Sequence, residues 1–377
     1  MKKVRLGIIG CGGLANDSQL PAIRILEDEG KLEITCTCDT ILERAQNSAA
    51  LFGENVKAFT DYRDMLDHVD AVSIVLPHDL HFECGMFFAT HKKHILMEKP
   101  LCNTEEECNR LIAECEKQGV VLMCEYPIRY MPEIRALKAE LDSGKYGEAF
   151  HMSIWTEGRT DNERMIPGTA GYWQCTSRLG GGQFFSHGCH YVDMLLWFMG
   201  DPLEGAHFGT NMGTPWMIRE GTSTLSMKFK NGATAMHYGT WGAKGTKMGY
   251  QYQIFTTSGK VLVLTKNQVR VYYNAERWAQ EDNDPNYVRD DGTFLKNAYK
   301  DDGKISKYEV VWEKSVLGPD IKNLHGVIAE FVDCVQTGRE SFTSGRRALE
   351  SLRTIWKLYR AEENHVVADL TDIVAPR

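Results

Sequence analysis

A glycine-rich hexapeptide near the start of the sequence has the residue types that bind a pyrophosphate. The segment Gly10-Cys11-Gly12-Gly13-Leu14-Ala15 fits the pattern G-x-G-x-x-A between the apolar run Val4–Gly10 and a helical stretch. Gly10 permits a tight turn, Gly12 lets the backbone approach a phosphate, and Ala15 allows close helix packing. Amide groups at the helix N-terminus would stabilise the phosphate charge. The pattern predicts a dinucleotide site rather than a plain tight turn.

An acidic residue after the second strand-like run indicates which dinucleotide binds. Asp39 follows Leu32–Cys38, roughly 20 residues after the glycine motif, where a carboxylate accepts hydrogen bonds from ribose hydroxyls. Its charge would repel a 2′-phosphate, and Thr40, Ile41 and Leu42 provide no arginine to bind one. We therefore expect NAD and disfavour NADP. A compatible alternative is that Asp39 caps the helix that begins near Ile41.

The elements that must position these residues alternate regularly in the first third of the chain. Thr104 and Glu107 form a capping-box pattern at the start of one predicted helix. The β-α-β alternation predicts a doubly wound parallel sheet with right-handed crossovers. The predicted strands cover residues 4–10, 32–38, 70–76, 94–97 and 120–124, and the predicted helices include 41–52, 79–90 and 104–119.

After about residue 125 the pattern changes to longer strands joined by tight turns. Asn231-Gly232 and Ser258-Gly259 indicate antiparallel hairpins. Residues 281–307 are polar and predict a long surface excursion. The predicted strands are 150–155, 221–229, 233–241, 250–257, 261–264 and 269–273, and the predicted helices are 132–141, 190–199, 321–336 and 346–362.

The predicted fold class is therefore α/β with two domains. Residues 1–125 form a Rossmann-type dinucleotide-binding domain with a doubly wound parallel sheet. Residues 126–377 form a C-terminal α+β domain with a large open, mostly antiparallel sheet for substrate binding and oligomerisation. The last helices could pack back on the first domain. We expect a homodimer or homotetramer, because an open sheet would otherwise leave one apolar face in water.

The composition excludes several other classes of protein. The chain has 377 residues and 42.7 kDa, of which 43% are hydrophobic and 25% charged, an ordinary globular balance. A net charge of −8 disfavours nucleic-acid binding and a polybasic membrane surface. No apolar run approaches the ~18 residues of a spanning helix. The first residues lack the pattern of a signal peptide.

The cysteines indicate a reducing compartment. There are eleven, an odd number, and Cys36, Cys38 and Cys124 lie within strand-like runs where a thiol behaves as a small hydrophobe. Their spacing fits no zinc pattern, so we expect no metal site. These features predict a cytoplasmic protein.

Several further motifs occur in order along the chain. They are Leu76-Pro77 with His81, Glu98-Lys99-Pro100-Leu101, Ser143-Gly144-Lys145-Tyr146-Gly147, and Gly180-Gly181-Gly182 before Gly188-x-His190-x-x-Asp193. Together with the glycine-rich turn, this set resembles the glucose–fructose oxidoreductase, inositol dehydrogenase and rhizopine-catabolism (Gfo/Idh/MocA) family over most of the chain. The resemblance implies NAD-dependent hydride transfer from a secondary hydroxyl of a sugar, cyclitol or glycoside.

The resemblance also implies a catalytic pair. Lys99 would reach the nicotinamide and the substrate hydroxyl, where a cation stabilises a developing alkoxide. His190 matches the acid/base histidine of the family. Members commonly carry an aspartate four residues before this histidine, whereas this chain has Ser186 followed by His187. Either Ser186 only hydrogen-bonds the substrate, or His187 or Asp193 takes over part of the role. Asp193 lies three residues from His190 on the same helical face, and its alternative role is that of a buried structural acid.

Other predicted site residues surround this pair. Their alternative role is ordinary structural packing. Aromatic faces such as Trp173 suit sugar rings, and Tyr126 and Arg129 could line the cleft after the strand 120–124. The residues expected near the nicotinamide are Leu76, Pro77, His78, His81, Glu98 and Lys99, and those expected near the substrate are Lys99, Tyr126, Arg129, Trp173, Ser186, His187 and His190.

Two other functions fit the same sequence. In the first, NAD stays tightly bound and is recycled, so that a keto intermediate allows elimination, epimerisation or glycoside cleavage without net NADH. In the second, the chain is a non-catalytic sugar and NAD sensor, as one yeast repressor that resembles this family is. The presence of both Lys99 and His190 disfavours the sensor.

Overall fold

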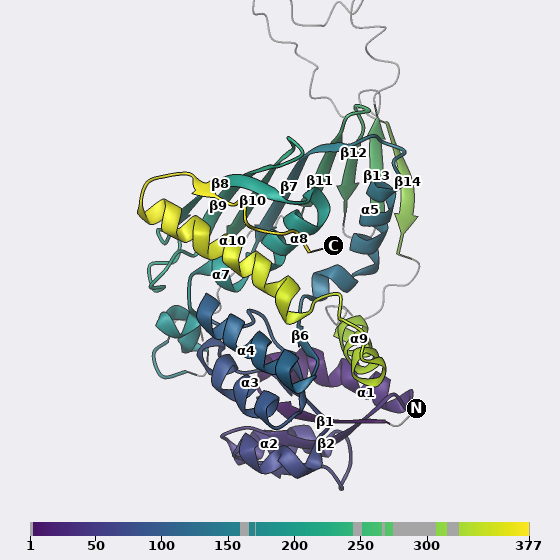
Figure 1. Cartoon of the computed structure of the whole chain (residues 1–377), viewed down its shortest axis with the longest axis vertical. Coiled ribbons are helices and arrows are strands. Elements are labelled where there is room, and N and C mark those ends of the chain that lie inside the picture. Colours follow the sequence, from purple (N-terminus) through teal and green to yellow (C-terminus); the bar gives the residue numbers. More distant parts are fainter. Residues whose placement is uncertain are drawn as a thin grey trace, which may run out of the picture.

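The computed structural model describes residues 3–158, 166–169, 171–243, 251–265, 268–273, 307–314 and 324–376. The first part of the chain forms a six-stranded parallel sheet with the order β3-β2-β1-β4-β5-β6, drawn in the lower half of Figure 1. Its strands are β1 (Val4–Ile9), β2 (Leu32–Cys38), β3 (Lys57–Phe59), β4 (Ala71–Ile74), β5 (His94–Met97) and β6 (Leu122–Cys124).

Helical segments connect these strands. They are η1 (Ala15–Gln19, a π-helical turn), α1 (Leu20–Asp28), α2 (Leu42–Ala50), η2 (Tyr62–His68), η3 (His78–Leu80), α3 (His81–Thr90) and α4 (Glu105–Gln118). The predicted capping box is confirmed, since Thr104 and Glu107 each accept from the other's backbone amide, at 3.2 and 3.1 Å. The short strand β3 has no counterpart among the predicted strands, because three partly exposed residues give no apolar run.

The second sheet has nine strands in the order β14-β13-β12-β11-β7-β10-β9-β8-β15. The hairpins predicted at Asn231-Gly232 and Ser258-Gly259 are confirmed as β9–β10 and β11–β12. Among the described strands β7 and β10 form a parallel pair, and the other pairs are antiparallel. The strands are β7 (Ala149–Glu157), β8 (Pro202–Thr210), β9 (Thr222–Phe229), β10 (Thr234–Thr240), β11 (Gln251–Thr256), β12 (Val261–Leu264), β13 (Gln268–Tyr273), β14 (Lys307–Glu313) and β15 (Ala368–Asp369).

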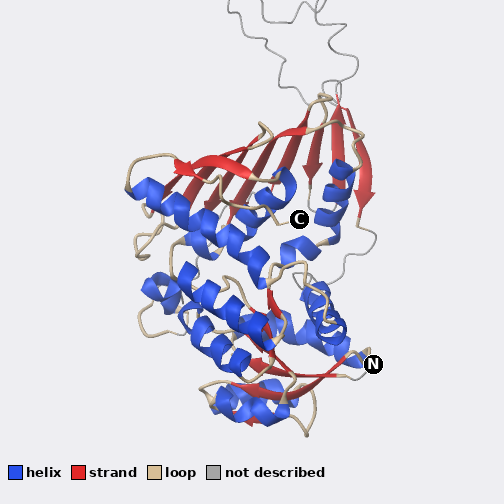
Figure 2. Cartoon of the chain, viewed as in Figure 1, coloured by secondary structure: helices blue, strands red, loops and turns tan. Residues whose placement is uncertain are grey.

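Helices cover one face of this large sheet (Figure 2). Helix α5 (Pro132–Asp142) packs on β12–β14, α8 (Cys189–Met199) on β7 and β10, and α10 (Gly345–Glu363) on β8. The opposite face carries Val261 and Val263, which are half-buried, whereas Ala235 points into the core. The polar excursion predicted over 281–307 lies almost wholly outside the described residues.

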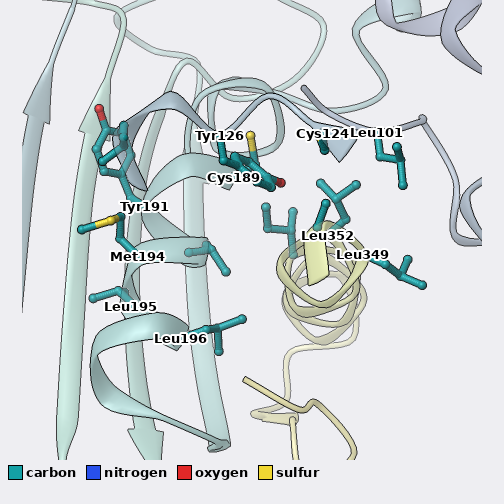
Figure 3. Packing of buried hydrophobic residues seen from close by; sticks show 14 of the residues in the cluster. Leu101, Cys124, Tyr126, Cys189, Tyr191, Met194, Leu195, Leu196, Leu349 and Leu352 are labelled. Atoms are coloured by element: carbon teal, nitrogen blue, oxygen red, sulfur yellow. The ribbon is translucent and has the colours of Figure 1, made fainter. Parts of the chain in front are cut away.

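The last helices return to the parallel sheet. Helix α9 (Leu324–Thr337) packs on α1, and α10 contacts both α8 and α4, so that it lies between the two sheets. Figure 3 shows α10 seen along its axis, with Leu349 and Leu352 in the same buried cluster as Leu101, Cys124 and Tyr126. The core is therefore continuous from one sheet to the other. The division at residue 125 stays a prediction.

The cysteines behave as small buried hydrophobes, as predicted. All eleven are buried free thiols. Burial raises the pKa of Cys11 and of Cys36 to about 11, so both thiols stay protonated at neutral pH. No helix in the described part of the chain is long and apolar enough to cross a membrane.

A buried ion pair ties α8 to the segment after β6. Arg129, in the 3₁₀ turn η4 (Pro127–Tyr130), donates to both carboxylate oxygens of Asp193 at 2.5 and 2.8 Å. Both side chains are almost fully buried, and the guanidinium also lies 5.0 Å from the ring centroids of Trp197 and Phe342. Burial raises the pKa of Asp193, and the guanidinium offsets part of that rise.

This pair decides between alternatives that the sequence leaves open for Arg129 and Asp193. Arg129 has no exposed surface to offer a substrate, so it does not line the cleft. Both carboxylate oxygens of Asp193 bind Arg129 rather than His190. Asp193 therefore does not replace the aspartate of the family, whose position Ser186 occupies in this chain. Spacing along a helix placed Asp193 near His190, but the stronger bidentate bond decides where the carboxylate points.

We expect the pair to stabilise the fold substantially. Arg129→Met would leave the Asp193 carboxylate buried without its cation, at a cost of about 3–5 kcal/mol of unfolding free energy. Removing both charges in Arg129→Met/Asp193→Leu should recover much of the loss. Asp142→Asn, which breaks the surface pair with Lys138, is the control and should cost under about 1 kcal/mol. Urea denaturation followed by tryptophan fluorescence measures all three, and a loss as small as the control's would refute the assignment.

Candidate active site

The glycine-rich turn has the geometry that its sequence predicts. Gly10 has φ +93°, and a Cβ there would lie 2.2 Å from the carbonyl oxygen of Val75. Around Gly12, in contrast, nothing lies within 4 Å of a Cβ position. Ala15 is fully buried at the start of η1. The turn is therefore closed against β4 at Gly10 and open at Gly12, which fits a pyrophosphate at the open side.

Asp39 closes the other side of this turn. Its Oδ2 accepts from the backbone amide of Cys11 at 3.0 Å, and its Oδ1 accepts from the amide of Ile41 at 2.9 Å. Asp39 does not cap α2, because the helix begins at Leu42 with Ile41 as its N-cap and has no side-chain cap; the bond to Ile41 closes a turn before the helix. A carboxylate has about four acceptor positions, so two bonds leave capacity for ribose hydroxyls. The residues that predicted a dinucleotide fit one in their arrangement.

The segment after β4 carries two histidines with different surroundings. Leu76 and Pro77 are partly exposed, and Leu76 lies beside Gly10. His78 is buried, its Nδ1 lies 3.0 Å from the carbonyl oxygen of Leu179, and its ring packs edge-on against Trp173. Burial, with Lys99 nearby, lowers the pKa of His78 well below the ordinary value, so the neutral ring donates from Nδ1.

His81, which the sequence places near the nicotinamide, is enclosed by backbone segments. Its side chain is fully buried, and its Nδ1 and Nε2 lie 2.8 and 2.9 Å from the carbonyl oxygens of Pro100 and Leu76. The ring therefore joins the segment after β4 to the segment after β5. Burial lowers its pKa. This role is to hold Pro100, and with it Lys99, in place.

Lys99 connects the two sheets. It follows β5, its peptide bond to Pro100 is cis, and its ammonium donates to the backbone carbonyl oxygen of Ser186 at 3.0 Å. Ser186 ends the short helix α7 (Gln183–Ser186). The side chain of Lys99 is half-buried. Two residues that are distant in the sequence, and predicted to share one site, are thus in contact.

The glycine triplet before α7 is required by a close approach. A Cβ at Gly182 would lie 2.2 Å from the carboxyl group of Glu220. The hydroxyl of Tyr359, on α10, accepts from the amides of Gly182 and Phe185 at 3.2 Å and donates to Glu220 at 2.6 Å. Glu220 and Tyr359 were missed by sequence reasoning, since nothing near them in the sequence marks a site. They position the segment that carries Ser186 and His187.

The two candidate bases lie next to each other. His190 is buried on α8, and His187 is more exposed, with ring centroids 6.1 Å apart. The side-chain nitrogen Nε2 of Gln183 lies 3.4 Å from Nδ1 of His187. The side-chain oxygen Oε1 of Gln183 accepts from the Ser223 hydroxyl at 3.1 Å. Ser223 on β9 therefore helps to orient His187 through Gln183.

Tyr126 supports His190 rather than a substrate. Its ring packs edge-on against the His190 ring at 5.6 Å, and its hydroxyl lies 2.8 Å from the hydroxyl oxygen of Ser351 on α10. The side chain is only 1% exposed, which favours the structural-packing alternative for Tyr126. Its hydroxyl therefore faces the core, where it is hydrogen-bonded to Ser351.

Partly exposed aromatic residues flank the histidines. Trp173 lies against His78, and Trp241 lies 6.3 Å from His187 between ring centroids. The aromatic cluster includes Tyr172, Trp173, Trp216 and Trp241, packed on Cys175, Leu179 and Met217. Of these tryptophans sequence reasoning found Trp173 alone. Within the described residues no cluster of three or more His, Cys, Asp or Glu side chains could hold a metal ion.

The geometry assigns different roles to the two glycines of the turn. Gly12→Ala should leave the melting temperature nearly unchanged, because its Cβ enters open space, and should weaken NAD binding at least tenfold (~1.4 kcal/mol). Gly10→Ala should lower the unfolding free energy by about 1–3 kcal/mol, because of its φ and the clash with Val75. Calorimetric NAD titration and thermal melts separate the two effects. Equal NAD affinity in wild type and Gly12→Ala would contradict this placement of the pyrophosphate.

Two sequence profiles of one family match the chain. The profile "Oxidoreductase family, NAD-binding Rossmann fold" matches residues 4–126, and the profile "GFO/IDH/MocA C-terminal domain" matches residues 134–262. The first range spans the parallel sheet and the second spans most of the antiparallel sheet.

Known proteins resemble the chain over different lengths. It is 22% identical over 343 residues to 2,7-anhydro-N-acetylneuraminate hydratase from Mediterraneibacter gnavus, with 87% of each chain covered. It is 27% identical over 216 residues to D-glucoside 3-dehydrogenase from Escherichia coli, covering 56% of this chain and 59% of that one.

A solved structure shares the fold over nearly the whole length. Levoglucosan dehydrogenase in complex with NADH and levoglucosan superposes with a TM-score of 0.79 over 98% of this chain and 99% of that one, at 17% identity. The glycine-rich turn, the two sheets and both profiles agree. The chain therefore belongs to the Gfo/Idh/MocA family of NAD-binding oxidoreductases.

Proposed function

We propose that this oxidoreductase oxidises a secondary hydroxyl of a sugar, cyclitol or glycoside, with Lys99 and His190 acting on that hydroxyl. The observation that carries the proposal is the hydrogen bond from Lys99 to the Ser186 carbonyl oxygen. This bond places the Lys99 ammonium, the cation of the Glu-Lys-Pro motif, next to the segment that carries the two histidines. The chemistry supplied by bound NAD is acceptance of a hydride.

The residues of this chain would divide the proton chemistry between them. The Lys99 ammonium donates to the substrate oxygen and stabilises the negative charge that develops as the hydride leaves. The His190 imidazole accepts the hydroxyl proton and returns it in the reverse reaction. The neutral, buried rings of His78 and Tyr126 pack around the site and limit the water that reaches it.

The substrate class follows from the aromatic side chains and the relatives. Trp173 beside His78 and Trp241 near His187 offer partly exposed ring faces, and such faces pack against the C–H groups of a sugar ring. Relatives named for a glucoside and for levoglucosan support a carbohydrate. Asp39 beside Cys11 supports NAD over NADP, because its charge would repel a 2′-phosphate.

A second candidate is an enzyme that recycles its NAD. Oxidation of a ring hydroxyl to a ketone acidifies the neighbouring C–H bond, which permits elimination, epimerisation or glycoside cleavage before the hydride returns. Two observations favour keeping this candidate. Ser186 stands where the family usually has an aspartate, and a relative that spans most of the chain is named a hydratase.

One screen separates the two candidates. The protein is incubated with NAD and with free sugars, inositols and glycosides, while the NADH absorbance band is followed and the products are identified by mass spectrometry. Net NADH with a keto product supports the dehydrogenase. A changed product without net NADH supports the recycling enzyme. No product from any carbohydrate class would refute both.

The catalytic pair makes a specific prediction. Lys99→Met should leave NAD affinity nearly intact, because the pyrophosphate site is built by the glycine turn, but should lower turnover about a hundredfold or more. His190→Ala should do the same and should remove one ionisation from the pH–rate profile. Ser186→Ala is the control, because its carbonyl oxygen and not its hydroxyl binds Lys99. It should cost no more than about one hydrogen bond, near 1 kcal/mol.

The histidine assignment has a clear counter-result. His187 is close to His190 and more exposed. If His187→Ala abolishes turnover while His190→Ala keeps most of it, His187 is the base and the substrate enters from the other side of this segment.

We further propose that the protein forms a homodimer or homotetramer through the open face of the large sheet. That face carries Trp155, which is 40% exposed and stacks on Tyr238 with centroids 4.2 Å apart, together with Val261 and Val263. Light scattering should give at least twice 42.7 kDa, and Val263→Asp should shift the mass toward one chain. A single-chain mass for the wild type would overturn the proposal.

A further inference from the structure

A buried polar cluster that the proposed mechanism does not use lies at the ends of the central parallel strands. Glu125 directly follows β6, and its side chain is fully buried. Both of its carboxyl oxygens accept from the side-chain amide of Gln19, at 3.1 and 3.0 Å. Gln19 is the last residue of η1, and its amide oxygen accepts from Ser73 on β4 at 2.8 Å.

A second carboxyl group completes the cluster. Glu98, which precedes Lys99, is only 7% exposed and lies beside Glu125, because each follows one member of the register pair Met97 and Cys124 on the parallel strands β5 and β6. Two carboxylates in contact repel each other, and a hydrogen bond between them needs a proton on one of them. The Gln19 amide occupies one acceptor position on each oxygen of the Glu125 carboxyl group, and the other positions are left for a bond with Glu98. The backbone fixes both residues, since Glu98 donates to Ile74 and Glu125 donates to Met97, at 3.0 and 2.8 Å.

We propose that Glu125 is a positioning residue that keeps one proton and shares it with Glu98, so that the pair presents a single negative charge beside Lys99. This inference rests on the proposed role of Lys99. A single negative charge on the pair balances the Lys99 ammonium and leaves its hydrogen bond to the Ser186 carbonyl oxygen, which joins the two halves of the structure, intact. Two charges would draw the ammonium toward the carboxyl pair and away from the substrate. Through Gln19 the same cluster reaches the helical turn that follows the dinucleotide motif.

The surroundings agree with a shared proton. Burial, followed by the charge of Glu98, raises the pKa of Glu125 well above the ordinary value. The charged and titratable groups that face it are Glu98 and Lys99 after β5 and Cys124 on its own strand, with Cys189 of α8 beyond Cys124. Burial raises the pKa of Cys124 well above its ordinary value and that of Cys189 to about 12. Both thiols therefore stay neutral between pH 5 and pH 9.

Glu125→Gln tests the proposal without any substrate, because glutamine offers the same donor and acceptor as a protonated glutamate. Glu43→Gln, on the exposed side of α2, is the matched control. Infrared spectra at neutral pH should show a protonated-carboxyl band that shifts with isotope-labelled glutamate. This band should lose intensity in Glu125→Gln and stay unchanged in Glu43→Gln. Equal bands in wild type and Glu125→Gln would overturn the proposal.

The pH dependence of stability gives an independent reading. A carboxyl group whose pKa is raised on folding holds a proton in the folded state that the unfolded chain loses above about pH 4.3. The folded-to-unfolded ratio of the wild type should therefore fall as pH rises, by up to about tenfold per unit, until the folded pKa is passed. Glu125→Gln should have a smaller slope than the wild type, and Glu43→Gln should keep the wild-type slope. The slope that remains in Glu125→Gln comes from the other buried carboxyl groups with a raised pKa, Asp193 and Glu220. A Glu125→Gln protein that fails to fold would contradict a protonated Glu125.

NAD binding separates positioning from a merely structural role. In the wild type, NAD affinity should weaken at alkaline pH as the pair gains its second charge, and Glu125→Gln should hold its affinity at least one pH unit further. Identical pH profiles would overturn the positioning role. Failure of the carbohydrate screen would not affect the infrared spectra, the pH dependence of stability or the pH dependence of NAD affinity, so the two proposals fail separately.

Discussion

The hydrogen bond between the Lys99 ammonium and the Ser186 carbonyl oxygen joins two sheets whose topologies share nothing. The segment that carries Lys99 and the segment that carries Ser186 are each fixed by hydrogen bonds to neighbouring residues. His81 lies between the carbonyl oxygens of Pro100 and Leu76 and, as a neutral ring, donates to one of them, and Glu220 and Tyr359 hold the amides around α7. A cation on a long side chain has many rotamers, so its direction must come from such neighbours.

The seam between the sheets is rich in buried polar groups, each of which costs free energy unless it is hydrogen-bonded. Arg129 and Asp193 neutralise each other, His78 is neutral and bonded to Leu179, and Tyr126 is bonded to Ser351. These bonds connect residues from both ends of the chain, so they specify one relative placement of the sheets. An apolar seam of the same area would tolerate sliding, which a two-sided active site does not.

Local patterns predicted what local physics decides. The capping box at Thr104 depends on residues three apart in sequence. The glycine turn and Asp39, which lies 28 residues from Cys11, belong to one motif of known spacing, and the geometry of all three follows the prediction. Strands of both sheets were predicted where apolar residues form runs or alternate, whereas β3, β8, β14 and β15 were missed. Arg129 and Tyr126 were placed near the substrate because residues after a parallel strand usually face a ligand, whereas here their long-range partners turn them inward.

Residues recruited from far along the chain escaped prediction. Glu220, Tyr359 and Trp241 stand in ordinary surroundings in the sequence, and only the fold brings them to the α7 segment. Glu125 is similar, because a single glutamate after a short strand has no periodicity to distinguish it. Such groups are found by asking which buried polar atoms contact the predicted residues, a question that needs coordinates.

The position of α10 has a consequence for biosynthesis. Strand β6 is the last in the parallel sheet, and its outer edge pairs with Ser344 and Thr343 just before α10. A chain that grows at about 5–20 residues per second exposes that edge for on the order of ten seconds or more before its cover is synthesised. The dinucleotide-binding half thus folds early with an open strand edge, a template for wrong pairing. We therefore expect nascent chains of this enzyme to aggregate most readily between the synthesis of β6 and the synthesis of α10. Chains released from ribosomes that stall in this interval would expose the unpaired edge of β6.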